Sequence, residues 1–286
     1  MTHLPPDQPD WLDATAREQL LMALHQRPCG LFTDIDGTIS PLAPTPAEAR
    51  LLPGARELLA EAQAVFAVVA AVSGRSARDA RRMVGLPGLV YIGNHGLERL
   101  EPTDTEDGES AITLFPGAEV YDQPIRDALA EVGQALAPLV AGVRLEAKGV
   151  TASIHVRQTA DPQAAEAAAY AAALAAAQTA GLRVTRGKLV VELRPPLAVD
   201  KGVGVAALIA ERHLRGAIYI GDDTTDIDAF RALRRLTAEG TLAGVAVAVL
   251  QEEAPPTLGV EADLTLPSIA AVPDLLRWLI DQAHAG

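Results

Sequence analysis

Short apolar runs alternate with segments of helical spacing along most of the chain. Apolar runs that read as buried strands cover residues 29–35, 64–75, 89–96, 217–223 and 244–250. Segments of helical spacing cover residues 55–63, 76–85, 201–214, 224–236 and 268–283. Continuous apolar strands that alternate with helices are typical of a mostly parallel sheet with helices on both faces. The pattern therefore predicts an α/β fold of Rossmann-like architecture.

The middle of the chain has a different pattern. Residues 101–110 are acidic and rich in turn formers, and a helix is expected at about 121–141. Strands 143–148 and 151–158 alternate in polarity, as a half-exposed antiparallel hairpin does. An Ala-rich helix (164–181) and a strand pair around Gly187 follow. We therefore expect an α/β domain of residues 1–108 and 197–286, with an α+β domain, 109–196, inserted into it.

Composition narrows the class of protein. The chain has 286 residues, of which 49% are hydrophobic, so it can bury a sizeable core. Its formal charge of −13 makes nucleic acid a poor partner. The Ala-rich segment 164–181 is short for a membrane span and contains Glu166 and Gln178, so it reads as a soluble helix. Cys29 is the one cysteine, and residues 1–11 lack a secretory pattern. We expect a cytoplasmic protein that binds neither nucleic acid nor membrane and acts as a monomer.

Two aspartates leave the first predicted strand one residue apart. Asp34 and Asp36 can point to the same side, at the end of the strand where open α/β sheets bind ligands. A tight turn would explain Asp36-Gly37, but not a second aspartate that emerges from an apolar run. Two carboxylates this close repel, so one stays protonated or a cation lies between them. An oxygen-rich acidic site suits Mg²⁺.

A second acidic cluster follows strand 217–223. Helix capping accounts for one or two acids at such a position, but not for four within seven residues. We therefore favour metal binding over capping for this group, which comprises Asp222, Asp223, Asp226 and Asp228.

Two further positions carry weaker signals. Ser73 ends a buried strand, and Gly74 lets the backbone approach a ligand, although Ser-Gly is also an ordinary turn. Lys201 begins a predicted helix, where a cation opposes the helix dipole. A solvated surface lysine is the alternative for Lys201. An anionic substrate would need such a local cation in an acidic chain.

These motifs, in this order, resemble those of the haloacid dehalogenase superfamily of phosphotransferases. The first motif, D-x-D-G-T, stands at Asp34–Thr38; the second, a Ser or Thr at a strand end, matches Ser73. The third, a lysine, matches Lys201, and the fourth, an acidic strand end, matches Asp222. The inserted domain resembles a cap domain of the C2 type. The resemblance covers nearly the whole chain after about residue 28.

Within that superfamily the chain looks like the trehalose-6-phosphate phosphatase family. The family pattern G-D-D-x-T-D begins at Gly221, and the pattern G-D-S-x-N-D of sucrose phosphatases is absent. Ile39 departs from the usual leucine, which is a volume-conserving change. Three further family patterns are also present. G-x-H-G-x-E stands as Gly93, His95, Gly96 and Glu98, and E-x-K-G stands as Glu146, Lys148 and Gly149. A glutamate before R-P stands as Glu192, Arg194 and Pro195.

The resemblance implies a mechanism for a Mg²⁺-dependent phosphoric monoester hydrolase. Asp34 would be the nucleophile that forms an aspartyl-phosphate, and Asp36 would protonate the departing oxygen and then activate water. The metal would be held by Asp34, the backbone carbonyl of Asp36, and Asp222. Asp223 and Asp226 would orient metal-bound waters. Phosphate oxygens would be bound by Thr38, Ser73, Gly74 and Lys201.

The inserted domain would recognise the sugar. Glu146 and Lys148 share one face of a strand, and Glu192 would join them from the second hairpin. A plain surface ion pair is the alternative for Glu146 and Lys148. Asn94 and His95 are weaker sugar-binding candidates, with Glu98 beside them, and a buried structural histidine is the alternative for His95. Two domains also predict a lid that closes over the substrate.

Three functions stay open on the sequence. The leading one is hydrolysis of trehalose 6-phosphate to trehalose and phosphate, in trehalose biosynthesis. A second is the same chemistry on another sugar phosphate, such as glucosylglycerol or mannosylglycerate phosphate. A third is a non-catalytic sugar-phosphate sensor. The intact set of acids and lysine argues against the sensor, because a sensor does not need a nucleophile.

Overall fold

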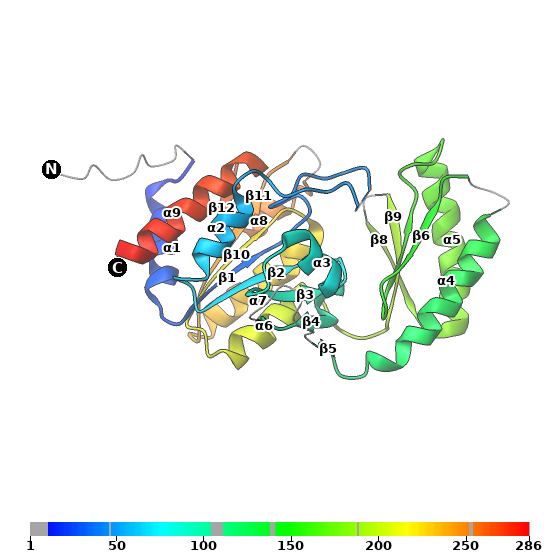
Figure 1. Cartoon of the computed structure of the whole chain (residues 1–286), viewed down its shortest axis with the longest axis horizontal. Coiled ribbons are helices and arrows are strands. Elements are labelled where there is room, and N and C mark those ends of the chain that lie inside the picture. Colours follow the sequence, from blue (N-terminus) through cyan, green and yellow to red (C-terminus); the bar gives the residue numbers. More distant parts are fainter. Residues whose placement is uncertain are drawn as a thin grey trace. The chain divides into compact units, whose positions relative to one another are not determined.

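A computed structural model describes residues 11–45, 47–103, 111–137, 141–187, 189–251 and 254–285. The chain divides into two compact units, Met1–Thr113 with Val199–Gly286, and Leu114–Ala198; Figure 1 shows their elements. The expected domain boundary at 108/109 lies outside the described residues. The other boundary was expected between residues 196 and 197, and the structure divides the chain between Ala198 and Val199.

The first unit contains a sheet with strand order β12-β11-β10-β1-β2-β3-β4-β5. Neighbouring strands from β12 to β3 are parallel, and β4 runs antiparallel to β3. β1 lies in the middle, between β10 and β2. The strands are β1 (Cys29–Thr33), β2 (Val68–Val72), β3 (Val90–Gly93), β4 (Glu98–Leu100), β5 (Ile112–Leu114), β10 (Gly216–Gly221), β11 (Ala243–Val249) and β12 (Leu264–Leu266).

Helices cover both faces of this sheet because its strands are apolar on both faces. In β10, Ile218 and Ile220 join one hydrophobic core, whereas Ala217 and Tyr219 join the other. This alternation is the period of two that a strand imposes on its side chains. The first core is covered by α1 (Ala14–His25), α2 (Ala55–Ala62), α3 (Ala77–Val84) and α9 (Val272–Ala285). The second is covered by α6 (Lys201–Glu211), α7 (Thr224–Ala238) and α8 (Leu258–Glu261).

Local sequence signals fix the helix ends that carry the site. Ser76 caps α3, and its hydroxyl accepts a hydrogen bond from the N–H of Asp79. Gly85 ends α3 in the left-handed conformation. Asp200 caps α6, so Lys201 is the first residue of that helix. The described residues also form 3₁₀ turns at η1 (Asn94–Gly96), η2 (Glu119–Tyr121) and η3 (Ile269–Ala271).

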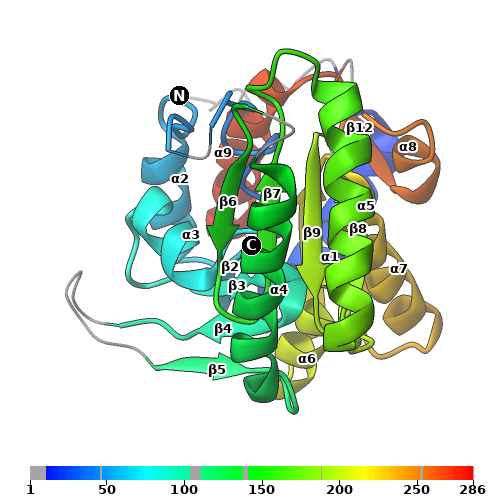
Figure 2. The same ribbon diagram turned by 90° about the vertical axis from the view of Figure 1, so that its right-hand side faces the viewer.

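The second unit is an antiparallel sheet with strand order β6-β7-β9-β8. Figure 2 shows α4 and α5 side by side along one face of this sheet. Their apolar side chains pack on Ile154, Val191 and Leu193 to form a separate core. The elements are α4 (Asp122–Leu136), β6 (Arg144–Ala147), β7 (Ala152–His155), α5 (Pro162–Ala180), β8 (Arg183–Gly187) and β9 (Val190–Arg194).

The α/β fold class predicted from the sequence is confirmed. The predicted order of helix, hairpin, helix and hairpin in the middle of the chain is confirmed as well. The short strands β4, β5 and β12 and the helices α1 and α8 were not predicted. Among the described residues, no helix combines the length and the apolar character that crossing a bilayer requires.

Candidate active site

Three of the predicted site residues follow adjacent strands of the central sheet. Asp34 comes directly after β1, Asp222 after β10 and Ser73 after β2. Because β1 pairs in parallel with both β10 and β2, the carboxyl ends of the three strands meet at one edge. The N–H of Asp34 also donates to the carbonyl of Ile220, 2.8 Å away, which ties the two loops together.

A lysine lies inside a cluster of buried carboxylates at this edge. The Nζ of Lys201 is 3.0 Å from Oδ1 of Asp34 and 2.7 Å from Oδ1 of Asp226. Carboxylate oxygens of Asp34, Asp222 and Asp226 lie within 4.8 Å of one another. All four side chains are buried. The structure therefore brings the first, third and fourth motifs together, and Lys201 is not a surface lysine.

Both carboxylate oxygens of Asp226 accept hydrogen bonds from residues of the same unit. Its Oδ1 accepts from Lys201 and from the hydroxyl of Tyr219, both at 2.7 Å. Its Oδ2 accepts from the backbone N–H of Asp222 at 3.0 Å and of Asp223 at 2.9 Å. Asp226 therefore shapes the loop that carries Asp222. This position supports a role around a metal ion rather than as a direct ligand.

Two neutral donors orient Asp222. The hydroxyl of Thr38 donates to Oδ1 at 2.9 Å, and the amide of Gln251 donates to Oδ2 at 3.2 Å. The same Gln251 amide donates to the carbonyl of Gly37 at 2.6 Å. Gly37 has φ +96°, and a Cβ there would overlap the Asp222 carboxylate. The glycine of D-x-D-G-T is therefore required both for its backbone conformation and for this close approach.

Burial has the largest single effect on the pKa values of these groups. It raises the pKa of Asp34 well above the ordinary range, against the lowering effect of Lys201. Burial, and then the charge of Asp226, raises the pKa of Asp222 to about 7. Burial alone would lower the pKa of Lys201, but Asp226 and Asp34 outweigh it and raise that pKa. The lysine is therefore a permanent cation among acids that are costly to ionise.

The donor set fits a hard divalent cation. Buried carboxylate oxygens of Asp34 and Asp222 converge here, and oxygen ligands are those that Mg²⁺ prefers. Burial raises the pKa of both acids and so disfavours their ionised forms. A divalent cation bound between them would favour their ionised form.

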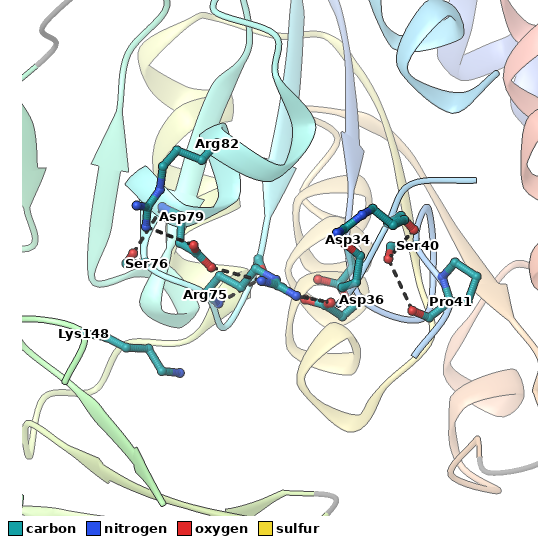
Figure 3. Close-up of polar contacts among 12 residues, drawn as sticks. Asp34, Asp36, Ser40, Pro41, Arg75, Ser76, Asp79, Arg82 and Lys148 are labelled. Atoms are coloured by element: carbon teal, nitrogen blue, oxygen red, sulfur yellow. Dashed lines mark hydrogen bonds and ion pairs between the residues drawn. The ribbon is translucent and has the colours of Figure 1, made fainter. Parts of the chain in front are cut away.

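Asp36 is paired with an arginine. Nε and Nη2 of Arg75 bind Oδ2 and Oδ1 of Asp36, both at 2.7 Å. Nη1 of Arg75 binds Oδ2 of Asp79 at 3.0 Å. Figure 3 shows the guanidinium between the two carboxylates. Arg75 was not among the predicted site residues, although it directly follows the predicted Ser73-Gly74 motif.

The turn after β2 is fixed by the segment that carries Asn94 and His95. The N–H of His95 donates to the carbonyl of Ser73 at 3.0 Å, and that of Asn94 to the carbonyl of Arg75 at 2.7 Å. A Cβ on Gly74 would lie 2.7 Å from the His95 ring. Both Asn94 and His95 have positive φ. They thus shape the candidate phosphate-binding turn, and their role in sugar binding stays a prediction.

The second unit presents a polar sheet face opposite its helices. Lys148 Nζ and Ser153 Oγ lie 3.2 and 3.1 Å from Oε1 of Glu192. Nε2 of His155 is 2.7 Å from Oε2 of Glu146. This hydrogen bond lowers the pKa of Glu146, against burial and with help from nearby cations. The three residues of this unit that were predicted to bind sugar, Glu146, Lys148 and Glu192, thus lie on one face of the sheet, together with Ser153 and His155.

A haloacid dehalogenase-like hydrolase from Bacteroides thetaiotaomicron has a similar structure, with TM-score 0.59 and 15% identity, covering 88% of this chain and 99% of that one. The fold is thus that of haloacid dehalogenase-type hydrolases. The trehalose-phosphatase family model matches residues 32–262, so the chain belongs to the trehalose-phosphatase family.

Two relatives lie closer to the chain. A trehalose-phosphate phosphatase of Mycobacterium tuberculosis is 37% identical over 228 residues, which cover 78% of this chain and 55% of the relative. The chain spans about half the length of the curated relatives that it matches. The structure of trehalose-6-phosphate phosphatase from Aspergillus fumigatus (crystal form 3) has TM-score 0.61 at 25% identity, covering 93% of this chain and 97% of that one.

Proposed function

We propose that the chain is a phosphatase that hydrolyses trehalose 6-phosphate to trehalose and phosphate. The observation that carries the proposal is the buried Asp34, which lies 3.0 Å from Lys201 at the carboxyl end of the central strand, beside Asp222. A carboxylate in this place can attack a phosphorus atom while a fixed cation binds the phosphate oxygens. Membership of the trehalose-phosphatase family supports the substrate.

In the proposed reaction, an oxygen of Asp34 bonds to phosphorus as the bond from phosphorus to the sugar oxygen breaks. Asp36 gives a proton to that oxygen, so trehalose leaves as a neutral alcohol. Asp36 then takes a proton from water, which attacks the aspartyl-phosphate and releases phosphate and free Asp34. Thr38, Ser73 and Lys201 bind the phosphate oxygens, with the backbone at Gly74.

We infer that Mg²⁺ is the cofactor, held by Asp34, the backbone carbonyl of Asp36, and Asp222. When bound, it neutralises charge on the transferring phosphoryl group and favours the ionised nucleophile. Asp223 and Asp226 keep the Asp222 loop in place around the site.

The second unit is proposed as the specificity domain. Its polar sheet face offers carboxylates, a lysine and a serine, which together can donate to and accept from many sugar hydroxyls. Glu146, Lys148 and Glu192 are the proposed sugar-binding residues. We also propose that the enzyme is cytoplasmic and monomeric, as expected from the sequence.

A phosphate-release screen over a panel of sugar phosphates, with Mg²⁺ and with EDTA, tests the proposal. We expect trehalose 6-phosphate to give the highest kcat/KM, activity to require Mg²⁺, and Asp34→Asn to abolish turnover. A higher kcat/KM for glucosylglycerol or mannosylglycerate phosphate would replace the substrate and keep the chemistry. Wild-type protein that releases no phosphate from any of them would refute an enzyme and favour a sensor.

A further inference from the structure

Arg75 holds both carboxylate oxygens of Asp36 in a two-point ion pair with N···O distances of 2.7 Å. A guanidinium and a carboxylate form two such hydrogen bonds only in a narrow range of orientations. The pair therefore fixes the direction in which the Asp36 carboxylate points, and not just its charge.

The guanidinium is itself held in place. Its third nitrogen binds Asp79 at 3.0 Å, and the side chain is only 10% exposed. The N–H of Arg75 donates to the hydroxyl of Ser73 at 3.1 Å, and its carbonyl accepts from Asn94. Main chain and side chain are thus both tied to the end of β2. Because the Asp36 side chain is 30% exposed, it is less restrained by its own packing than Arg75 is. The fixed guanidinium can therefore restrain the orientation of the Asp36 carboxylate.

Two acids neutralise Arg75. Arg82 also pairs with Asp79, so the formal charge of these four side chains is +2 − 2 = 0. An arginine in this state is poorly suited to attract a phosphate dianion. Its contacts instead suit it to orient the Asp36 carboxylate.

We propose that Arg75 is a positioning residue that orients Asp36 for proton transfer to the leaving oxygen. One Asp36 oxygen keeps its bond to Arg75 while the other carries the proton to that oxygen. This inference rests on the proposed function only in assigning Asp36 as the general acid. It does not depend on which sugar phosphate is the substrate.

The test uses a series of aryl phosphates from p-nitrophenyl phosphate to phenyl phosphate, with Mg²⁺ present. A good leaving group departs without a proton, whereas a basic one needs the acid. We expect kcat/KM of the wild type to vary little along the series. For Arg75→Met it should stay near wild type with p-nitrophenyl phosphate and fall by about ten- to a hundredfold with phenyl phosphate. Arg75→Lys, which keeps one donor, should be intermediate.

Arg82→Ala is the matched control. Arg82 also pairs with Asp79, at 3.1 Å, but its side chain is 78% exposed and makes no contact with Asp36. This variant should follow the wild type along the whole series. Asp36→Asn is the positive control and should show the steepest fall.

The possible outcomes distinguish failure of the positioning role of Arg75 from failure of the proposed function. An even loss across the series in both Arg75→Met and Arg75→Lys would overturn the positioning role, because a purely structural defect does not distinguish leaving groups. A wild-type profile for Asp36→Asn would refute the acid itself, and the role of Arg75 with it. Failure to hydrolyse trehalose 6-phosphate, with a steep Arg75→Met profile, would overturn the substrate alone.

Discussion

Replacing Asp222 by asparagine should change stability in a way that depends on pH. Burial and the charge of Asp226 raise the pKa of Asp222 from 3.8 to about 7 in the folded protein. In metal-free protein, the stability associated with neutral Asp222 is fully present below about pH 4 and is lost as pH rises through about 7. The complete loss is about 4 kcal/mol, since each pKa unit corresponds to about 1.4 kcal/mol.

Asparagine avoids this loss but disturbs the hydrogen bonds. Thr38 and Gln251 both donate to Asp222, and one amide oxygen cannot accept from both as the carboxylate does. That mismatch costs about 1–3 kcal/mol at every pH. At pH 8 in EDTA, Asp222→Asn should therefore be more stable than wild type by about 1–3 kcal/mol. At pH 4.5 this advantage should shrink by about 3 kcal/mol or reverse.

Urea unfolding at the two pH values, followed by tryptophan fluorescence, measures this difference. Both tryptophans, Trp11 and Trp278, belong to the first unit, so the signal reports on the unit that carries Asp222. Glu18→Gln, at an exposed position of α1, controls for removal of one acid from that unit. An equal change in unfolding free energy at pH 4.5 and pH 8 would refute the reasoning. Added Mg²⁺ should stabilise the wild type at pH 8 and lose most of this effect in Asp222→Asn.

Three further variants test other parts of the site. Lys201→Met removes the buried cation of the acidic cluster and should lower the unfolding free energy by about 3–5 kcal/mol in urea; wild-type stability would contradict the ion pairs. Gln251→Leu removes a donor to Asp222 and should weaken Mg²⁺ binding in calorimetry about tenfold; an unchanged Kd would exclude that role. Glu192→Gln should raise KM for trehalose 6-phosphate about tenfold and leave p-nitrophenyl phosphate hydrolysis unaltered; equal losses on both would remove it from sugar binding.

The fold could be predicted largely from apolar periodicity. β2 and β10 are continuous apolar runs because helices cover both of their faces, and such runs are visible in the sequence. β4, β5 and β12 span only three residues each, too few for any period to stand out. Helix α1 was not identified because the apolar Met22 lies on its exposed side, which blurs the helical period, and its N-cap, Asp13, resembles any other loop aspartate.

The acids and the lysine of the candidate site could be predicted because they lie at strand and helix ends, and the carboxyl ends of parallel strands meet at one edge of the sheet. Their hydrogen-bond partners could not be predicted. Gln251 follows β11, and it reaches Gly37 and Asp222 only because β11 lies beside β10 in the sheet. Tyr219 lies inside a strand and reads as ordinary core, yet its hydroxyl donates to Asp226. Such contacts depend on strand order and side-chain direction, which spacing alone does not specify.

The charge of the site bears on how the proposed phosphatase would bind an anionic substrate. Counting Asp34, Asp222, Asp226 and Lys201, the buried cluster has a formal charge of −3 + 1 = −2. Lys201 is already shared between two of these acids, so it cannot by itself offset a phosphate dianion as well. Burial raises the pKa of Asp34 and of Asp222, which favours their protonated forms in the absence of further positive charge. A protonated Asp34 is a poor nucleophile. The same divalent cation would therefore meet two needs of the proposed reaction, ionising Asp34 and admitting the phosphate, and substrate binding and nucleophile activation would depend on it together.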